Sequence, residues 1–222
     1  MKIVLLGPPG GGKGTQAAEL SRRRGIPAIS TGDMFRDHVE RGTELGRRVR
    51  GFIERGELVP DALVLDMVWD RLAAKDCETG FILDGFPRTV EQAEALDQYL
   101  ADRGQSLLAV INLEVPAEEI VRRISNRRVC PVCGRSYHMI AMPPAEDERC
   151  DVEGAALIHR EDDRPEVILR RLEEYHARTE PVVHYYRRAG ILRPVCGVAS
   201  AEQVAAAVLR EIEGAAARAV TG

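Results

Sequence analysis

The segment GPPGGGKGT, residues 7–15, has the composition of a phosphate-binding loop. Gly12 and Lys13 occupy the last glycine and the lysine of the pattern G-x-x-x-x-G-K-[ST]. Glycines let successive N–H groups point at phosphate oxygens, and the lysine reaches the β- and γ-phosphates. The pattern expects Ser or Thr directly after the lysine, but Gly14 stands there and the hydroxyl residue, Thr15, follows one position later. The segment predicts a nucleoside triphosphate site but leaves the reaction open.

A carboxylate at the end of an apolar run is the second candidate. In FILDGFPRT, residues 81–89, Asp84 ends the hydrophobic stretch. A carboxylate in that position can hold Mg²⁺ through water, although Asp-Gly is also a common turn. Together with the glycine loop, Asp84 favours the metal interpretation.

Three cysteines fall within 21 residues, Cys130, Cys133 and Cys150. With Glu153 in fourth place they fit a four-ligand zinc pattern, and Asp151 and His138 compete for that place. The segment has little apolar content, so a structural zinc ion is expected to hold it together. The chain has five cysteines, and an odd number argues against a disulfide framework.

Composition narrows the class of protein. The 222 residues carry a formal net charge of −4, which argues against sequence-blind nucleic-acid binding. No apolar run approaches the roughly 20 residues that span a bilayer, and the apolar start is too short for a signal peptide. We expect a cytoplasmic protein. The chain has three lysines and 28 arginines, so a single arginine is weak evidence of function.

The surrounding elements fit a doubly wound α/β fold. Apolar runs at 2–7, 81–84, 107–115 and 191–195 indicate buried parallel strands that alternate with helices, the first helix over Lys13–Arg24. Capping boxes are predicted at Thr89 with Gln92 and at Ser200 with Gln203, and Pro116 marks a helix start. Segments 30–60 and 128–161 break the alternation. The first looks helical without a strand, and both are interpreted as lobes inserted into one core.

Several separated motifs resemble adenylate kinases, in the right order and over essentially the whole chain. They are GPPGGGKGTQ, STGDMFR, DGFPRT, RRV before the cysteines and REDD after them. The resemblance is to the long-lid bacterial form with a zinc-bearing lid, whose loop reads G-x-x-G-x-G-K-G-T. The Gly14-Thr15 pair is therefore ordinary for that family. The resemblance implies a five-stranded parallel sheet with helices on both faces. It divides the chain into a core of 1–29, 60–126 and 164–222, an AMP lobe of 30–59 and a lid of 127–163.

The implied reaction is Mg-ATP + AMP ⇌ 2 ADP by direct in-line transfer in a monomer. A phosphate oxygen of AMP is already ionised near neutral pH, so no general base is expected. The implied catalytic residues are Lys13, Asp84, Arg88, Arg123, Arg127, Arg160 and Arg171. The implied ATP ligands are Gly10, Gly11, Gly12, Lys13, Gly14, Thr15, Arg123, Arg127, Tyr137 and Ala199. The implied AMP ligands are Thr31, Arg36, Glu57, Leu58, Val59, Gly85, Phe86, Pro87, Arg88, Gln92, Arg160 and Arg171. The implied zinc ligands are Cys130, Cys133, Cys150 and Glu153.

Some alternatives stay open at this stage. Gln92 serves either the capping box or an adenine edge, and the resemblance favours adenine. Asp162 and Asp163 fit a charge-paired hinge or latch, an N-cap before Pro165, or both together. The same fold acting on UMP, CMP or GMP is the nearest other function. A nucleotide switch fused to a zinc-ribbon interaction module is the alternative from a different class.

Overall fold

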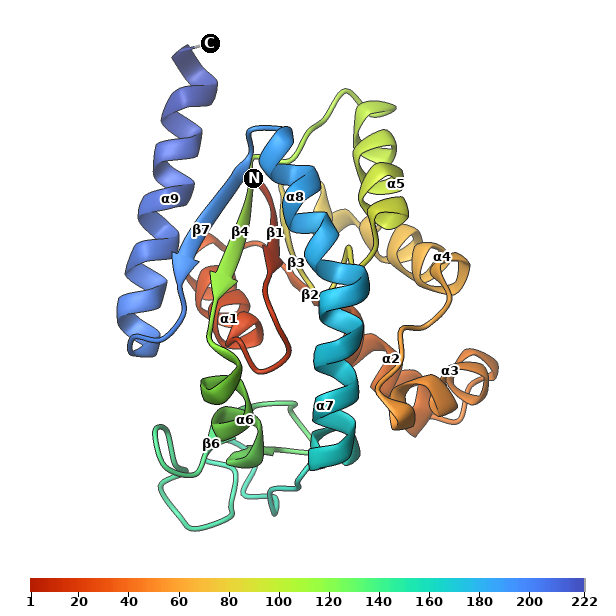
Figure 1. Ribbon diagram of the computed structural model, residues 1–222, viewed down its shortest axis with the longest axis vertical. Coiled ribbons are helices and arrows are strands. Elements are labelled where there is room, and N and C mark those ends of the chain that lie inside the picture. Colours follow the sequence, from red (N-terminus) through yellow and green to blue (C-terminus); the bar gives the residue numbers. More distant parts are fainter. Residues whose placement is uncertain (222) are drawn as a thin grey trace.

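A five-stranded parallel sheet forms the centre of the computed structural model, which describes residues 1–221 (Figure 1). The strand order is β2-β3-β1-β4-β7. The strands are β1 (Lys2–Leu6), β2 (Ala28–Ser30), β3 (Phe81–Asp84), β4 (Ala109–Glu114) and β7 (Leu192–Cys196). The predicted α/β class is confirmed. Residue 222, the end of the predicted core, lies outside the described residues.

The strand β2 is the member of the five-stranded sheet that the sequence pattern did not predict. It has three residues and pairs in parallel with β3, where Ser30 lies opposite Asp84. A run of three residues is too short to show periodicity, so only its pairing partner defines it as a strand.

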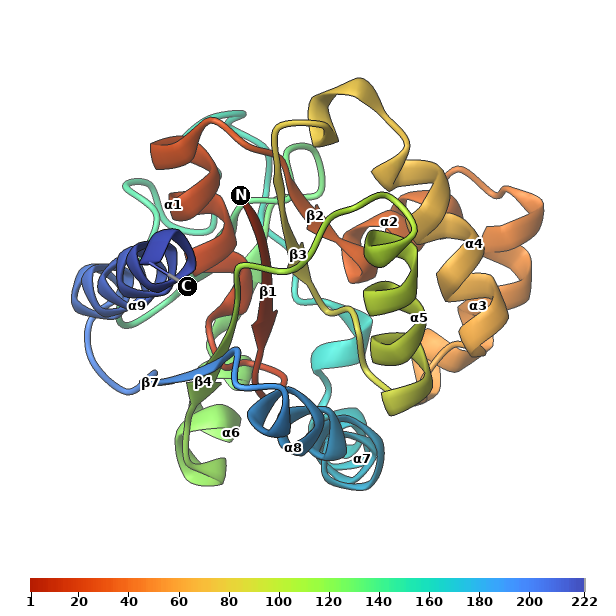
Figure 2. The same cartoon turned by 90° about the horizontal axis from the view of Figure 1, so that it is seen from above.

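Side-chain alternation along the strands builds two separate cores. On β1, Ile3 and Leu5 face one side and Val4 and Leu6 face the other, and all four are buried. The Ile3 side packs against α1 (Lys13–Arg24) and α9 (Ala201–Thr221), which lie together on that face in Figure 2. The other side packs against α4 (Asp61–Leu72), α5 (Val90–Ala101) and α8 (Glu180–Arg188). Both faces are therefore covered by helices.

The predicted helix starts differ in how fully they form. Ser200 and Gln203 form a reciprocal capping box, with N···O distances of 3.1 and 3.3 Å. At α5, Thr89 Oγ1 accepts from the backbone N–H of Gln92 at 3.2 Å, but the Gln92 side chain accepts from Arg88 instead. The prediction that the Gln92 side chain accepts from the backbone N–H of Thr89 is therefore wrong. Pro116 precedes α6 (Ala117–Ser125) as predicted.

Two segments project from the core. One carries α2 (Thr31–Glu40) and α3 (Glu44–Arg55), at the lower right of Figure 1. The other carries the short antiparallel strands β5 (Arg127–Val129) and β6 (Ser136–His138), below α6 in Figure 1. A 3₁₀ turn (Glu161–Asp163) then leads into α7 (Pro165–Glu174), a π-helical turn (Tyr175–Thr179) and α8, which return the chain to the core. Among residues 1–221, no helix has both the length and the apolar character needed to cross a bilayer.

Candidate active site

The glycine loop joins the end of β1 to the start of α1. Gly7, Gly10 and Gly12 have φ values of 139°, 73° and 89°, a region that favours glycine. The ammonium group of Lys13 donates to the carbonyl oxygens of Gly7 and Pro8, each at 2.8 Å. Burial lowers the pKa of Lys13 to about 8. The loop thus holds a half-buried cation at its centre, which suits a phosphate site.

Asp84 faces this loop from the end of β3, where it pairs in register with Leu5. Asp84 Oδ2 lies 3.4 Å from the position that a Cβ on Gly14 would occupy. Burial raises the pKa of Asp84, while the nearby Lys13 opposes that rise. A desolvated carboxylate beside a phosphate loop fits a divalent cation, because oxygen is the donor that Mg²⁺ prefers.

Two arginines converge on the 3₁₀ turn before α7. Arg127 forms a two-pronged ion pair with Asp163, and Arg171 lies 3.0 Å from Asp162 Oδ2 and 3.2 Å from Asp163 Oδ1. Burial lowers the pKa of Arg171, and the two aspartates oppose that shift. Both aspartates are at least nine-tenths buried. The hinge interpretation of these carboxylates fits these contacts, whereas neither side chain forms a cap on α7.

Two further arginines connect the projecting segments. Arg36 on α2 lies 2.5 Å from Asp33 Oδ1, and Arg160 approaches the same oxygen at 3.5 Å. Arg36 also lies 3.8 Å from Asp162 Oδ2. Burial, with Arg36 and Arg127 nearby, lowers the pKa of Arg160 to about 10. The segment carrying α2 and α3 therefore meets the end of the 127–163 segment through charged side chains.

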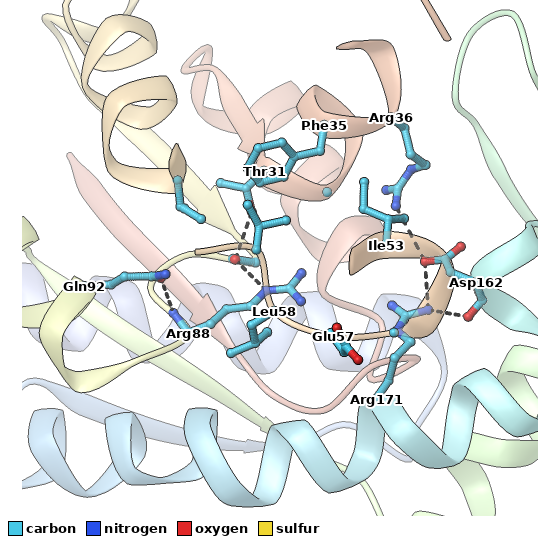
Figure 3. Close-up of a pocket in the computed structure, with 15 residues that line it drawn as sticks. Thr31, Phe35, Arg36, Ile53, Glu57, Leu58, Arg88, Gln92, Asp162 and Arg171 are labelled. Atoms are coloured by element: carbon cyan, nitrogen blue, oxygen red, sulfur yellow. Dashed lines mark hydrogen bonds and ion pairs between the residues drawn. The ribbon is translucent and has the colours of Figure 1, made fainter. Parts of the chain in front are cut away.

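A pocket opens beside these arginines, and Figure 3 shows its two polar ends. Thr31 and Arg88 form one end, where Thr31 Oγ1 and Arg88 Nε both donate to the carbonyl of Gly85 at 2.9 and 2.8 Å. Burial, and then Arg171, lower the pKa of Arg88 to about 10. The lining residues include Thr31, Arg36, Glu57, Leu58, Val59, Gly85, Arg88, Gln92 and Arg171. Nine predicted AMP ligands thus surround one cavity.

The remaining predicted AMP ligands lie outside the lining. Phe86 is fully buried and meets Trp69 edge-on, with ring centroids 6.1 Å apart. Pro87 follows it in the same turn, and Arg160 contacts the α2 segment as described above. Phe86 therefore supports the turn from the core side.

The predicted ATP-base neighbours are spread over two places. Arg123 on α6 donates to Glu119 Oε1 and to the carbonyl of Gly197, each at 2.8 Å, which ties α6 to the loop after β7. Ala199 is exposed in that loop. Tyr137 is buried in the 127–163 segment, where its hydroxyl donates to Cys150 Sγ at 3.4 Å. A base contact from Tyr137 stays a prediction.

The three clustered cysteines lie together in space. The Sγ atoms of Cys130, Cys133 and Cys150 are all within 4.8 Å of one another, and the Cys133–Cys150 separation is 3.6 Å. Tetrahedral zinc with bonds of about 2.3 Å needs sulfurs about 3.8 Å apart, so the donor set fits zinc.

The two halves of this cluster have the same backbone geometry. Gly134 N–H donates to Cys130 O at 3.0 Å, and Gly154 N–H donates to Cys150 O at 2.8 Å. Both glycines have left-handed φ values, 71° and 65°. Glu153 therefore occupies in the second turn the position that Cys133 occupies in the first. Its side chain is exposed and its carboxylate is not part of the sulfur cluster.

The two competing candidates, Asp151 and His138, each use one side-chain atom in a hydrogen bond to the backbone. Asp151 Oδ1 accepts from the backbone N–H of Ala145 at 2.7 Å. His138 Nδ1 accepts from the backbone N–H groups of Ile140 and Ala141 at 3.2 and 3.0 Å. Each contact uses one atom of its side chain, and among the described residues no carboxylate or imidazole lies in the sulfur cluster. Glu153 as the fourth ligand stays a prediction.

Comparison with known proteins identifies the family. A model of the family described as adenylate kinase matches residues 5–191. The chain belongs to the adenylate kinase family. The adenylate kinase of Archaeoglobus fulgidus is 52% identical over 204 residues, covering 92% of this chain and 94% of the relative. That of Thermotoga petrophila is 51% identical over 209 residues, covering 94% and 95%. That of Caldicellulosiruptor bescii is 52% identical over 192 residues, covering 86% and 89%.

Membership of the adenylate kinase family makes the chain a nucleotide-binding phosphotransferase. Two acidic residues of its site were not predicted. Asp33 had a local signal, since it lies three residues before Arg36 on one helix face. Asp61 had none, because its partners Thr89 and Gln92 are 28 and 31 residues away.

Proposed function

We propose that this family member transfers the γ-phosphoryl group of Mg-ATP reversibly to AMP and so forms two molecules of ADP. The observation that carries the proposal is the pocket of Thr31, Arg88 and Gln92 beside the half-buried Lys13, whose pKa Arg88 and Arg171 help to lower. The pocket is lined by hydrogen-bonding side chains suited to a base, Thr31 and Gln92, and by cations suited to phosphate, Arg36, Arg88 and Arg171.

Phosphoryl transfer to AMP needs positive charge around the phosphates more than it needs a general base to remove a proton. The second phosphate pKa of a monophosphate is about 6, so AMP is largely a dianion at neutral pH and is itself the nucleophile. The chain's task is to hold two anions in line and offset their repulsion. Lys13, Arg88 and Arg171 are neighbouring cations that suit this task, since both arginines help to lower the pKa of Lys13.

The ATP site is assigned to the glycine loop, with one arginine from α6 and one from β5. We assign the triphosphate to the backbone of Gly10, Gly11, Gly12, Gly14 and Thr15 with Lys13, Arg123 and Arg127. Tyr137 and the backbone of Ala199 are assigned to the base and ribose. When bound, Mg²⁺ supplies charge neutralisation on the β- and γ-phosphates, and Asp84 would hold it through water.

The AMP site is assigned to the pocket and its arginines. Arg36, Arg88, Arg160 and Arg171 are assigned to the phosphate groups, and Thr31 and Gln92 to the adenine. The backbones of Glu57, Leu58, Val59, Gly85, Phe86 and Pro87 complete the acceptor site. Residues 30–59 would then be the AMP lobe and 127–163 the lid, whose contact excludes water that otherwise accepts the phosphoryl group.

The lid is proposed to contain a structural zinc ion held by Cys130, Cys133, Cys150 and Glu153. We further propose that the protein acts as a monomer in the cytoplasm. All assigned ligands of both nucleotides come from one chain, which supports the monomer.

The test is a nucleotide assay with purified protein and Mg-ATP. AMP, UMP, CMP and GMP are offered separately, and diphosphates and free phosphate are resolved. Rapid ADP formation with AMP alone is expected. Preference for another monophosphate would overturn the base-recognition residues, and slow release of free phosphate without transfer would overturn the kinase assignment.

A further inference from the structure

The amide of Gln92 is held at both of its polar atoms. Its Oε1 accepts from the backbone N–H of Arg88 at 2.8 Å. Its Nε2 donates to Asp61 Oδ1 at 2.7 Å. Asp61 is the first residue of α4, and its second oxygen accepts from the hydroxyl of Thr89 at 3.0 Å. Gln92 and Thr89 are only 2% and 1% exposed, so water does not compete freely for these bonds.

These two partners leave the amide one orientation. A carboxylate can only accept and a backbone N–H can only donate, so exchanging the oxygen and nitrogen of Gln92 would lose both bonds. Asp61 therefore keeps the Nε2 atom of Gln92 turned toward the start of α4. Each amide atom retains one further capacity, a second N–H and a second lone pair. Gln92 lines the pocket, beside Arg88 in Figure 3.

The orientation of an amide decides which purine it reads. Adenine offers a donor at its 6-amino group and an acceptor at N1, whereas hypoxanthine and guanine offer an acceptor at O6 and a donor at N1. An amide free to rotate can satisfy either pattern when the phosphate is anchored elsewhere. An amide held in one orientation can hydrogen-bond to only one of the two patterns. With the other base, a donor would face a donor and an acceptor would face an acceptor.

We propose that Asp61 is a positioning residue that determines purine specificity by holding Gln92 in the orientation that reads adenine. Asp61 acts through Gln92 and need not touch the nucleotide. This inference rests on the proposed AMP site.

The experiment compares AMP with inosine monophosphate, which differs on this edge of the base. The variants are Asp61→Ala, Asp61→Asn and, as a control, Asp66→Ala, an exposed aspartate on the same helix. Asp61→Ala should lower the AMP-to-IMP ratio of kcat/KM about tenfold, since one orienting hydrogen bond is lost. KM for AMP should rise while KM for ATP stays unchanged. Asp61→Asn keeps an acceptor for Nε2 and should retain most of the discrimination.

Thermal unfolding of each variant separates positioning from helix stability, because Asp61 also places negative charge at the start of α4. Equal losses toward AMP and IMP would overturn the inference, as would an Asp61→Asn variant that loses discrimination like Asp61→Ala. In both cases wild-type preference for AMP would leave the proposed function intact. A wild-type protein that does not phosphorylate AMP would instead overturn the proposed function.

Discussion

Both carboxylate oxygens of Asp163 accept hydrogen bonds from Arg127. Arg127 Nε lies 2.8 Å from Oδ2, and Nη2 donates to Oδ1. The same carboxylate also lies 3.2 Å from Arg171 Nη1 and is only 1% exposed. One buried acid thus orients an arginine at the base of the proposed lid and another on α7.

Replacing Asp163 with alanine should therefore leave two largely buried cations without a shared anion. We expect the free energy of unfolding to fall by about 3–5 kcal/mol, the range for breaking one side of a buried ion pair. Urea unfolding measures it. The control is Asp37→Ala, which removes an exposed ion pair with Arg41 at 2.9 Å and should cost no more than about 1 kcal/mol. Equal losses in the two variants would contradict this account.

The lowered pKa of Lys13 predicts a pH dependence of ATP capture. Burial lowers this pKa from 10.5 to about 8, so the free protein loses the ammonium charge above pH 8. The value of kcat/KM for ATP should fall as the pH rises through about 8, because that parameter reports the free enzyme. The profile of kcat should extend to higher pH, since bound phosphate restores the charged form.

The same shift has a defined sign for stability. Protonated Lys13 is disfavoured in the folded state, so its penalty is present below pH 8 and is relieved as the pH rises from about 8 to 10.5. In the Lys13→Met variant this contribution to the rise in unfolding free energy should be missing. A wild-type kcat/KM for ATP that stays flat to pH 9.5 would contradict the pKa assigned to Lys13.

Zinc removal should unfold the proposed lid more than the core. The 127–163 segment has a small apolar cluster, whose buried members are Cys130, Tyr137, Cys150 and Leu157. Chelation should release about one zinc per chain, measured with a colorimetric indicator, and should lower the melting temperature. Glu153→Ala should weaken zinc binding, Glu153→Cys should preserve it, and Asp151→Ala should leave it unchanged. Zinc loss in Asp151→Ala alone would assign the fourth position to Asp151.

A pair of glycines on α3 provides a matched test of packing in the proposed AMP lobe. A Cβ on Gly46 would lie 2.0 Å from the carbonyl oxygen of His38, where α2 ends, whereas one on Gly51 would meet only the flexible end of Arg55 at 3.0 Å. Gly46→Ala should therefore destabilise the protein by about 1–3 kcal/mol and raise KM for AMP. Gly51→Ala should be neutral or stabilising by up to about 1 kcal/mol. Thermal unfolding and KM measurements check both, and an unaffected Gly46→Ala variant would contradict the close approach.

Local patterns in the sequence were enough to predict the framework. The glycine loop, the four longer strands, the start of α6 and the spacing of the cysteines each depend on neighbouring residues. Their physical cause, backbone geometry or periodic burial, therefore operates within a few positions of the chain. The motifs also led to the family, which the comparison confirmed.

Only the tertiary structure decided which charges meet. The 28 arginines are alike in sequence, and partners among Asp33, Asp162 and Asp163 are what distinguish Arg36, Arg127, Arg160 and Arg171. The strand β2 exists because β3 pairs with it. Asp61 reaches Gln92 across 31 residues of chain, and no local spacing encodes that contact. Electrostatic and hydrogen-bonding partners depend on distance in space, so the sequence determined the elements and their motifs while the fold determined how their side chains pair.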